Sequence, residues 1–302
     1  MTDLAGFHSA LPTPFTADGR IAERVPGDLV RHNIRAGMQG LYVGGSTGEA
    51  FLMSKEERAR SFKVAAEAAA GECVLIAHVG DLNPAVSIER AREAARAGYH
   101  SISAVPPFYY GYSFAELSAH YATLASATDL PFLIYNFPAL TGVTMSARQI
   151  VELLELPNVV GVKNTSADYY ALEQMRRLAP SKLFFNGFDE SLLAGLSMGA
   201  DGGIGSTYNL HPEKVLRLDE AFRAGDMAAA AAIQADINGL IDVLVAHGVL
   251  RSIKYLLELQ GFAAGTCRAP FAPLTAEAKE ALERAADTFL AASPKAPAEA
   301  EG

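Results

Sequence analysis

The 302-residue chain contains no tryptophan and only two cysteines, Cys73 and Cys267. Two cysteines cannot form the disulfide framework of a small secreted protein, so a reducing cytoplasm is the expected location. Residues 1–11 lack a basic start followed by an apolar stretch, and no secretory signal is expected there. No apolar run reaches the roughly 18 residues that a membrane-spanning helix needs, so a membrane partner is not expected.

Positive charge is also scarce. Lys and Arg number 25 against 34 Asp and Glu, which gives a net charge of -9, and no basic run is longer than Arg176-Arg177. Nucleic-acid-binding proteins usually carry a basic face, so DNA and RNA are not expected partners. The histidines form no H-x-H or H-E-x-x-H pair, and Asp189-Glu190 alone is weak evidence, so no metal site is expected. His78 is expected to be a hydrogen-bonded core residue.

Short apolar runs recur eight times and alternate with segments that have helical patterns. Continuous apolar runs are typical of strands that are buried on both faces of a parallel sheet. Eight strand–helix units are the number that closes a (β/α)8 barrel, which occupies about 250 residues. The sequence therefore predicts this α/β fold, with strands at residues 7–11, 40–45, 74–80, 101–108, 132–138, 159–165, 183–188 and 202–208.

Local signals mark the helices. Ser54 followed by Glu57 is a capping box, and Asn83 followed by proline is a favourable cap and first turn. The chain after the eighth strand holds more helix than one barrel unit requires. We therefore expect a (β/α)8 barrel at 1–224, C-terminal helices packed on it as part of the same unit at 225–292, and a disordered tail at 293–302. Helices are expected at residues 54–70, 83–97, 146–154, 168–178, 212–224, 226–246, 250–259 and 275–292.

Polar residues gather where the predicted strands end, which is where the active site of a (β/α)8 barrel lies. Lys163 interrupts an apolar strand, and burial would lower the pKa of its amine. A neutral amine can attack a ketone and form a Schiff base, which stabilises an adjacent carbanion; alternatively Lys163 reaches solvent at the barrel rim. Tyr135 is a candidate proton relay or a core tyrosine. The other candidates are Ser46, Thr47, Tyr109, Thr165, Gly187, Asp189, Glu190 and Ser206.

Residues 44–49 read GGSTGE and form a turn of small residues after the second strand. Its N–H groups and two hydroxyls suit a carboxylate or a phosphate, and it matches neither the dinucleotide nor the Walker pattern. Glu49 would repel an anion, so we expect it to bond backbone or hydroxyl groups and hold the turn. Residues 202–206 would suit a phosphosugar, although no Lys or Arg lies between Lys182 and Lys214.

Several long segments together resemble the dihydrodipicolinate synthase / N-acetylneuraminate lyase family, and within it the lyases. The resemblance spans roughly residues 7–274 and is carried by YVGGSTGEAF, SAVPPFYY, YNFPALTGV, GVKNTSADYYALEQMRR and FNGFDESLLAGLSMGADGGIGSTYN. It implies a (β/α)8 barrel with extra C-terminal helices, usually a homotetramer, without a metal or organic cofactor. The implied activity is a class I lyase that cleaves N-acetylneuraminate reversibly to pyruvate and N-acetyl-D-mannosamine.

The resemblance also implies roles for individual residues. Lys163 resembles the lysine that forms the Schiff base, and Tyr135 resembles the tyrosine that relays protons to and from the sugar hydroxyl. Ser46 and Thr47 resemble the pair that binds the substrate carboxylate, and Tyr109 is similar to a tyrosine supplied across a subunit interface. Positions that match contacts to the polyol chain of the sugar are Thr165, Gly187, Asp189, Glu190 and Ser206.

Three positions depart from the family patterns. Leu140 stands where dihydrodipicolinate synthases have an Arg for a second carboxylate, and their GTTGE reads GSTGE here, so that activity is less expected. Leu250 stands where several lyases have an aromatic residue, which leaves the aldehyde preference open. The alternatives are a pyruvate-dependent aldolase or dehydratase for another 2-keto-3-deoxy sugar acid, a non-catalytic barrel that binds a keto acid, and a phosphosugar enzyme.

Overall fold

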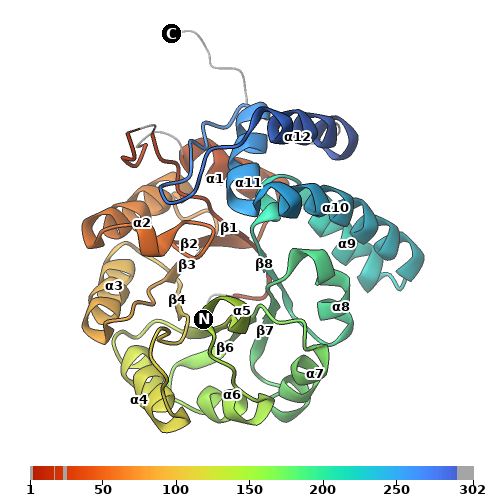
Figure 1. Ribbon diagram of the computed structural model, residues 1–302. Coiled ribbons are helices and arrows are strands. Elements are labelled where there is room, and N and C mark those ends of the chain that lie inside the picture. The colour runs from red at the N-terminus through yellow and green to blue at the C-terminus, as the bar shows by residue number, and fades with distance from the viewer. Residues whose placement is uncertain (1–2, 17, 23–25, 291–302) are drawn as a thin grey trace.

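Eight parallel strands close into a barrel in sequence order, which confirms the predicted (β/α)8 fold (Figure 1). The computed structural model describes residues 3–16, 18–22 and 26–290. The strands predicted from the sequence end one to four residues later than the observed strands. Apolar residues in the loops that follow the strands are also buried, so the sequence pattern does not mark the strand ends. The strands are β1 (Gly6–Ala10), β2 (Gly40–Val43), β3 (Val74–His78), β4 (Ser101–Ala104), β5 (Phe132–Asn136), β6 (Val159–Asn164), β7 (Leu183–Asn186) and β8 (Gly202–Gly205).

Helices surround the barrel, and short helical turns follow several strands at its carboxyl end. The predicted capping box is present, since the Ser54 and Glu57 side chains each accept a backbone N–H of the other residue. Asn83 caps its helix as expected. The surrounding helices are α1 (Pro26–Ala36), α2 (Lys55–Ala69), α3 (Pro84–Arg96), α4 (Phe114–Ala125), α6 (Ala147–Leu154), α7 (Tyr169–Leu178), α8 (Leu192–Ser197) and α9 (Pro212–Arg223), and the short turns are η1 (Ala50–Leu52), α5 (Pro138–Thr141), η2 (Asp189–Ser191) and η3 (Thr207–Asn209).

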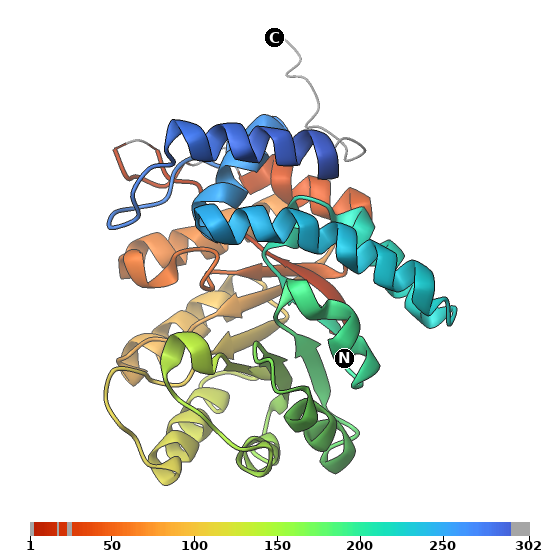
Figure 2. The same cartoon turned by 45° about the vertical axis from the view of Figure 1, so that its right-hand side comes forward.

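Three further helices, α10 (Met227–His247), α11 (Val249–Leu259) and α12 (Ala276–Phe289), lie together on one side of the barrel (Figure 2). α10 packs against α9, α11 and α12. By length and composition alone α10 is apolar enough to cross a membrane, with a mean hydropathy of 1.4. It nevertheless carries Asp236, which pairs with Lys214 of α9, so we interpret α10 as a helix of this bundle.

The expected boundary at 224/225 falls in the turn between α9 and α10. That barrel and bundle form one folding unit stays a prediction. The tail expected at 293–302, and the last two residues of the helix expected at 275–292, lie outside the described residues.

Alternation along each strand divides the core into two parts. On β2, Leu41 and Val43 face the surrounding helices, whereas Tyr42 faces the barrel interior. Tyr135 and Phe185 belong to the same interior cluster. Burying an apolar side chain of this size stabilises the fold by about 1.5–3 kcal/mol. The interior cluster therefore excludes water directly beside the polar carboxyl end of the barrel.

Candidate active site

Lys163 lies on β6 inside the barrel, and only 4% of the residue is exposed. Its register partners are Tyr135 on β5 and Phe185 on β7. The Nζ atom lies 4.3 Å from the ring centroid of Tyr135 and 4.3 Å from that of Tyr42. Burial lowers the pKa of Lys163 to about 7, and the Asp189 carboxylate opposes that shift. The amine is therefore buried, not extended to solvent at the rim.

Tyr135 is buried beside this amine, with 3% of the residue exposed. Burial raises the pKa of Tyr135 to about 12, although the hydroxyls of Ser46 and Thr165 that face it act to lower it. Its phenol is therefore protonated at neutral pH. Tyr135 can take a proton from a substrate only as it passes its own proton on, which suits a relay and not a free base.

The turn after β2, residues 44–49, is called the glycine turn below. Gly44 has φ 71, and a Cβ there would lie 2.9 Å from the Phe62 ring, so this position requires glycine. The Thr13 hydroxyl donates to the Gly48 carbonyl at 2.8 Å. Ser46 is half-buried and Thr47 is buried. The two hydroxyls therefore lie on a turn that is fixed by its surroundings.

Glu49 ends the glycine turn in the left-handed region, with φ 55. For a residue other than glycine this conformation costs about 1–2 kcal/mol. Its Oε2 accepts the Arg268 backbone N–H at 2.8 Å, and its Oε1 accepts from Lys254 Nζ at 2.5 Å. The expected backbone partner is present. The Lys254 ion pair was not expected, because Lys254 lies 205 residues away in sequence.

Asp189, in η2 after β7, is buried with one carboxylate oxygen bound and one free. Oδ2 accepts the Thr207 backbone N–H at 2.8 Å and its hydroxyl at 2.7 Å. Oδ1 has no hydrogen-bond partner in the described part of the chain. Burial raises the pKa of Asp189 to about 6, while the bonds from Thr207 lower it. Because a carboxylate already accepts the Thr207 N–H and would repel a phosphate, the structure opposes a phosphate site at residues 202–206.

Thr165 is buried beside Tyr135, and its Oγ1 faces the phenol without forming a full hydrogen bond among the described residues. A Cβ on Gly187 would lie 1.9 Å from this oxygen, so Thr165 can pack in its place only against a glycine. Of the other predicted residues on this side, Glu190 is exposed and Ser206 is half-buried. Hydroxyl and carboxylate oxygens without hydrogen-bond partners suit the hydroxyls of a sugar.

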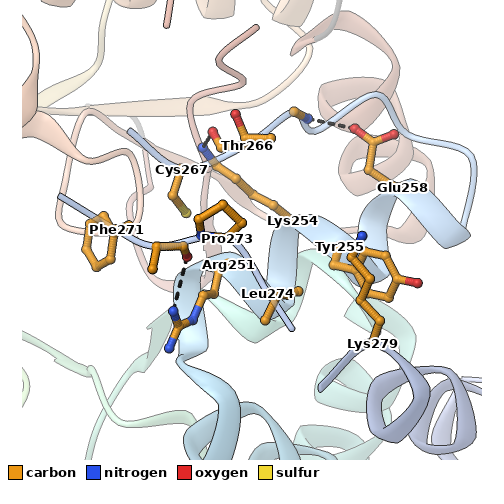
Figure 3. Close-up of a pocket in the computed structure, with 12 residues that line it drawn as sticks. Arg251, Lys254, Tyr255, Glu258, Thr266, Cys267, Phe271, Pro273, Leu274 and Lys279 are labelled. Carbon is orange, nitrogen blue, oxygen red and sulfur yellow. Dashed lines mark hydrogen bonds between the residues drawn. The ribbon is translucent and has the colours of Figure 1, made fainter. Parts of the chain in front are cut away.

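A cavity of about 310 Å³ lies at the barrel mouth, and Ser46 lines it. Leu140 and Leu250 also line it, so both departures from the family pattern lie at this mouth. A larger cavity of about 500 Å³ lies between α11 and residues 265–274 (Figure 3) and contains none of the predicted site residues. In the part of the chain that the structure describes, no group of three or more His, Cys, Asp or Glu side chains could hold a metal ion.

Tyr109 is not among the residues that line the mouth cavity. It is 82% exposed, and its φ of 90 lies outside the regions that a tyrosine usually adopts. Its ring contacts that of Tyr110, which is also exposed, with 5.0 Å between the centroids. That Tyr109 has a functional role stays a prediction.

Sequence reasoning missed Tyr42, whose ring contacts the Lys163 amine. Its hydroxyl donates to Ser103 Oγ at 3.1 Å. The alternation of β2 could have placed Tyr42 inside the barrel. His78, by contrast, is a hydrogen-bonded core residue, as expected: Nε2 accepts the Val105 N–H at 3.3 Å, so Nδ1 donates to the Gly44 carbonyl at 3.0 Å.

The chain is similar in sequence and in fold to known proteins. Residues 3–288 match the Dihydrodipicolinate synthetase family. An N-acetylneuraminate lyase from Rhizobium meliloti (strain 1021) is 43% identical over 289 residues, which cover 95% of this chain and 96% of that protein. A structure of CdNal from Clostridium difficile in complex with mannosamine aligns with a TM-score of 0.93 at 40% identity, over 95% of this chain and 100% of that one. A Ruminococcus gnavus sialic acid aldolase catalytic lysine mutant aligns with a TM-score of 0.92 at 32% identity, over 96% and 97% of the two chains.

Proposed function

The chain belongs to the dihydrodipicolinate synthetase family, and on that premise we propose that it is a lyase that cleaves N-acetylneuraminate reversibly to pyruvate and N-acetyl-D-mannosamine. The family resemblance expected from the motifs is thereby confirmed. The chain is a carbon–carbon lyase, because relatives named N-acetylneuraminate lyase match it over nearly its whole length. The single observation within the molecule that supports the chemistry is the buried Lys163 amine with its lowered pKa.

In the proposed reaction, neutral Lys163 attacks the C2 ketone of the substrate and water leaves, which forms a Schiff base. With a pKa of about 7, a large fraction of the amine is neutral at physiological pH. The protonated imine accepts the electron pair of the C3–C4 bond when that bond breaks. Because the imine is the electron sink, the reaction needs no metal or organic cofactor.

Tyr135 is proposed to relay the proton of the C4 hydroxyl. The pKa of Tyr135, about 12, argues that it does not lose its own proton before the substrate arrives. As the C3–C4 bond breaks, Tyr135 accepts the proton of the C4 hydroxyl and passes its own proton to the substrate carboxylate, from which that proton returns through Tyr135 to C3 of the enamine. Protonation of the resulting enamine and hydrolysis then release pyruvate and restore Lys163.

The remaining predicted residues are proposed to bind the two ends of the substrate. Ser46 and Thr47, on the glycine turn, would donate hydrogen bonds to the carboxylate. The free oxygens of Thr165 and Asp189 support a place for the sugar hydroxyls. Gly187, Glu190 and Ser206 are proposed to complete that side.

We propose that Tyr109 acts in a neighbouring subunit of a homotetramer. Its exposure and its φ of 90 support a contact outside its own chain. Tyr110 and Phe51 are exposed as well, and such apolar surface is typical of an interface. A cytoplasmic location remains a prediction from the two cysteines.

Borohydride reduction in the presence of pyruvate tests the proposed chemistry. The expected result is one pyruvyl adduct on Lys163, located by peptide mass spectrometry, and its loss in Lys163→Ala. Lys63→Ala, with a side chain that is 74% exposed, is a control that should be trapped normally. A Lys163→Ala protein with full lyase activity would contradict the assignment, and an untrapped wild-type protein would favour the keto-acid-binding barrel.

Substrate profiling separates the proposed function from its nearest alternative. The wild-type enzyme is expected to release pyruvate and N-acetyl-D-mannosamine from sialic acid. Faster release from a 2-keto-3-deoxy sugar acid without the acetamido group would favour the alternative. Competition by inorganic phosphate would favour a phosphosugar enzyme.

A further inference from the structure

The glycine turn is joined to the C-terminal helices by one fully buried ion pair. Lys254 of α11 donates to Glu49 Oε1 at 2.5 Å, and the two side chains are 2% and 0% exposed. The Lys254 ammonium also donates to the Thr266 carbonyl at 2.7 Å and lies 4.7 Å from the Phe15 ring centroid. Figure 3 shows Lys254 reaching from α11 to Thr266. A single side chain therefore connects the turn, α11 and the segment before α12.

The second Glu49 oxygen is bound by the same segment. It accepts the backbone N–H of Arg268, whose guanidinium donates to the Leu52 carbonyl at 2.7 Å and to Glu57. Glu49 has φ 55, a conformation that a glutamate rarely adopts without external restraint. Both of its carboxylate oxygens are therefore occupied in a way that holds the strained end of the glycine turn.

The restrained end of the glycine turn is connected directly to Ser46, which is proposed to bind the substrate carboxylate. The Glu49 backbone N–H donates to the Ser46 carbonyl at 3.0 Å. Leu250, one helical turn before Lys254, and Phe271, three residues after Arg268, line the same mouth cavity as Ser46. The elements that hold Glu49 therefore also form part of the wall of the cavity that the keto acid would enter.

We propose that Glu49 and Lys254 are positioning residues that fix the Ser46–Thr47 pair for the substrate carboxylate. This inference rests on the proposed function. A buried ion pair by itself adds little net stability compared with apolar side chains of the same size. The pair is placed where it sets the geometry of hydrogen-bond donors, and small displacements there weaken the binding of a carboxylate strongly.

The test is the carboxylate preference of Schiff-base formation. Borohydride trapping is measured against the concentration of pyruvate and of methyl pyruvate, which keeps the ketone and lacks the charge. The wild-type enzyme is expected to prefer pyruvate. In Glu49→Gln/Lys254→Met, which removes both buried charges, half-saturation by pyruvate should rise about tenfold, as for one lost charge-assisted hydrogen bond. Half-saturation by methyl pyruvate and the maximal extent of trapping should stay nearly unchanged.

The control is the ion pair of Lys214 with Asp236, which joins α9 to α10 and does not contact the glycine turn. Lys214→Met/Asp236→Asn should leave the preference for pyruvate intact. If the Glu49/Lys254 double variant is unstable, Glu49→Asp keeps both buried charges while it shortens the side chain that holds the turn, and it should reduce the preference about threefold. A folded variant with the wild-type preference would overturn the inference alone, whereas a wild-type protein that pyruvate does not label would overturn the proposed function with it.

Discussion

The amine of Lys163 lies 4.3 Å from the centroid of the Tyr42 ring. The electron-rich face of an aromatic ring attracts a cation, which is worth about 0.5–2 kcal/mol depending on exposure. Tyr42 is fixed in this place by its bond to Ser103 and by edge contact with Tyr135. The ring therefore stabilises the ammonium, and the iminium that would replace it, against the opposing effect of burial.

Removal of this ring should lower the pKa of Lys163 and weaken the iminium. In Tyr42→Leu, the midpoint of the pH dependence of pyruvate trapping is expected below the wild-type value near 7, with an about tenfold loss in kcat/KM. Tyr42→Phe keeps the aromatic face and loses only the hydroxyl bond, so its midpoint should stay close to the wild type. Equal shifts in both variants would show that the hydroxyl, and not the ring face, matters.

Lys163 should also destabilise the folded protein in a pH-dependent way. The pKa of Lys163 falls from 10.5 in the unfolded chain to about 7 in the fold, so between these values the unfolded state binds the additional proton. The resulting cost is complete below about pH 7 and disappears towards pH 10.5. Lys163→Met is therefore expected to be more stable than wild type by a few kcal/mol at pH 7, with a smaller gain at pH 9.5. Urea unfolding at the two pH values measures this, and an equal gain at both would contradict the lowered pKa.

Much of the fold could be predicted because it follows from local patterns. Eight apolar runs and the caps at Ser54 and Asn83 are read over a few residues, and the barrel places all strands in sequence order. The carboxyl ends of the strands were misjudged because residues such as Val105 and Tyr208 continue the apolar pattern into buried loops. These residues are buried although they lie beyond the strands.

In the candidate site, too, residues with a local signal in the sequence could be predicted and long-range contacts could not. Lys163 could be singled out because a lysine in an apolar strand is unusual, and its burial is what the structure describes. The partners of Glu49 could not be found in this way, because Lys254 and Arg268 are more than 200 residues away and carry no local signal. Long-range polar contacts of this kind depend on how the C-terminal helices pack.

Gly187→Ala should weaken binding of the sugar part of the substrate and leave binding of the pyruvate part unchanged. The added Cβ would lie 1.9 Å from Thr165 Oγ1, so the threonine must move from the position in which we propose that it contacts the sugar. We expect KM for N-acetylneuraminate to rise about tenfold, as for the loss of one good hydrogen bond. Trapping by pyruvate, which lacks the sugar part, should be unaffected and serves as the internal control. Equal loss of both would indicate that Lys163 itself has moved.

Tyr109 provides a test that distinguishes action within a chain from action across an interface. Tyr109→Ala removes the ring, and if the tyrosine takes part in proton transfer or substrate contact, kcat/KM should fall about a hundredfold. Tyr109→Gly should lose the same activity, yet unfold at a higher temperature than Tyr109→Ala, because glycine adopts a φ of 90 without strain.

Complementation between inactive variants then decides where Tyr109 acts. A subunit with Tyr109→Ala keeps Lys163, and a subunit with Lys163→Ala keeps Tyr109. Across a two-fold interface each subunit would place its own Tyr109 in the active site of its partner. In a mixed oligomer the site with Lys163 would then receive Tyr109 from the other subunit, so co-expressed mixed oligomers should be far more active than either parent. If Tyr109 acted in its own chain, no site in the mixture would hold both groups, and the mixed oligomers would be as inactive as their parents.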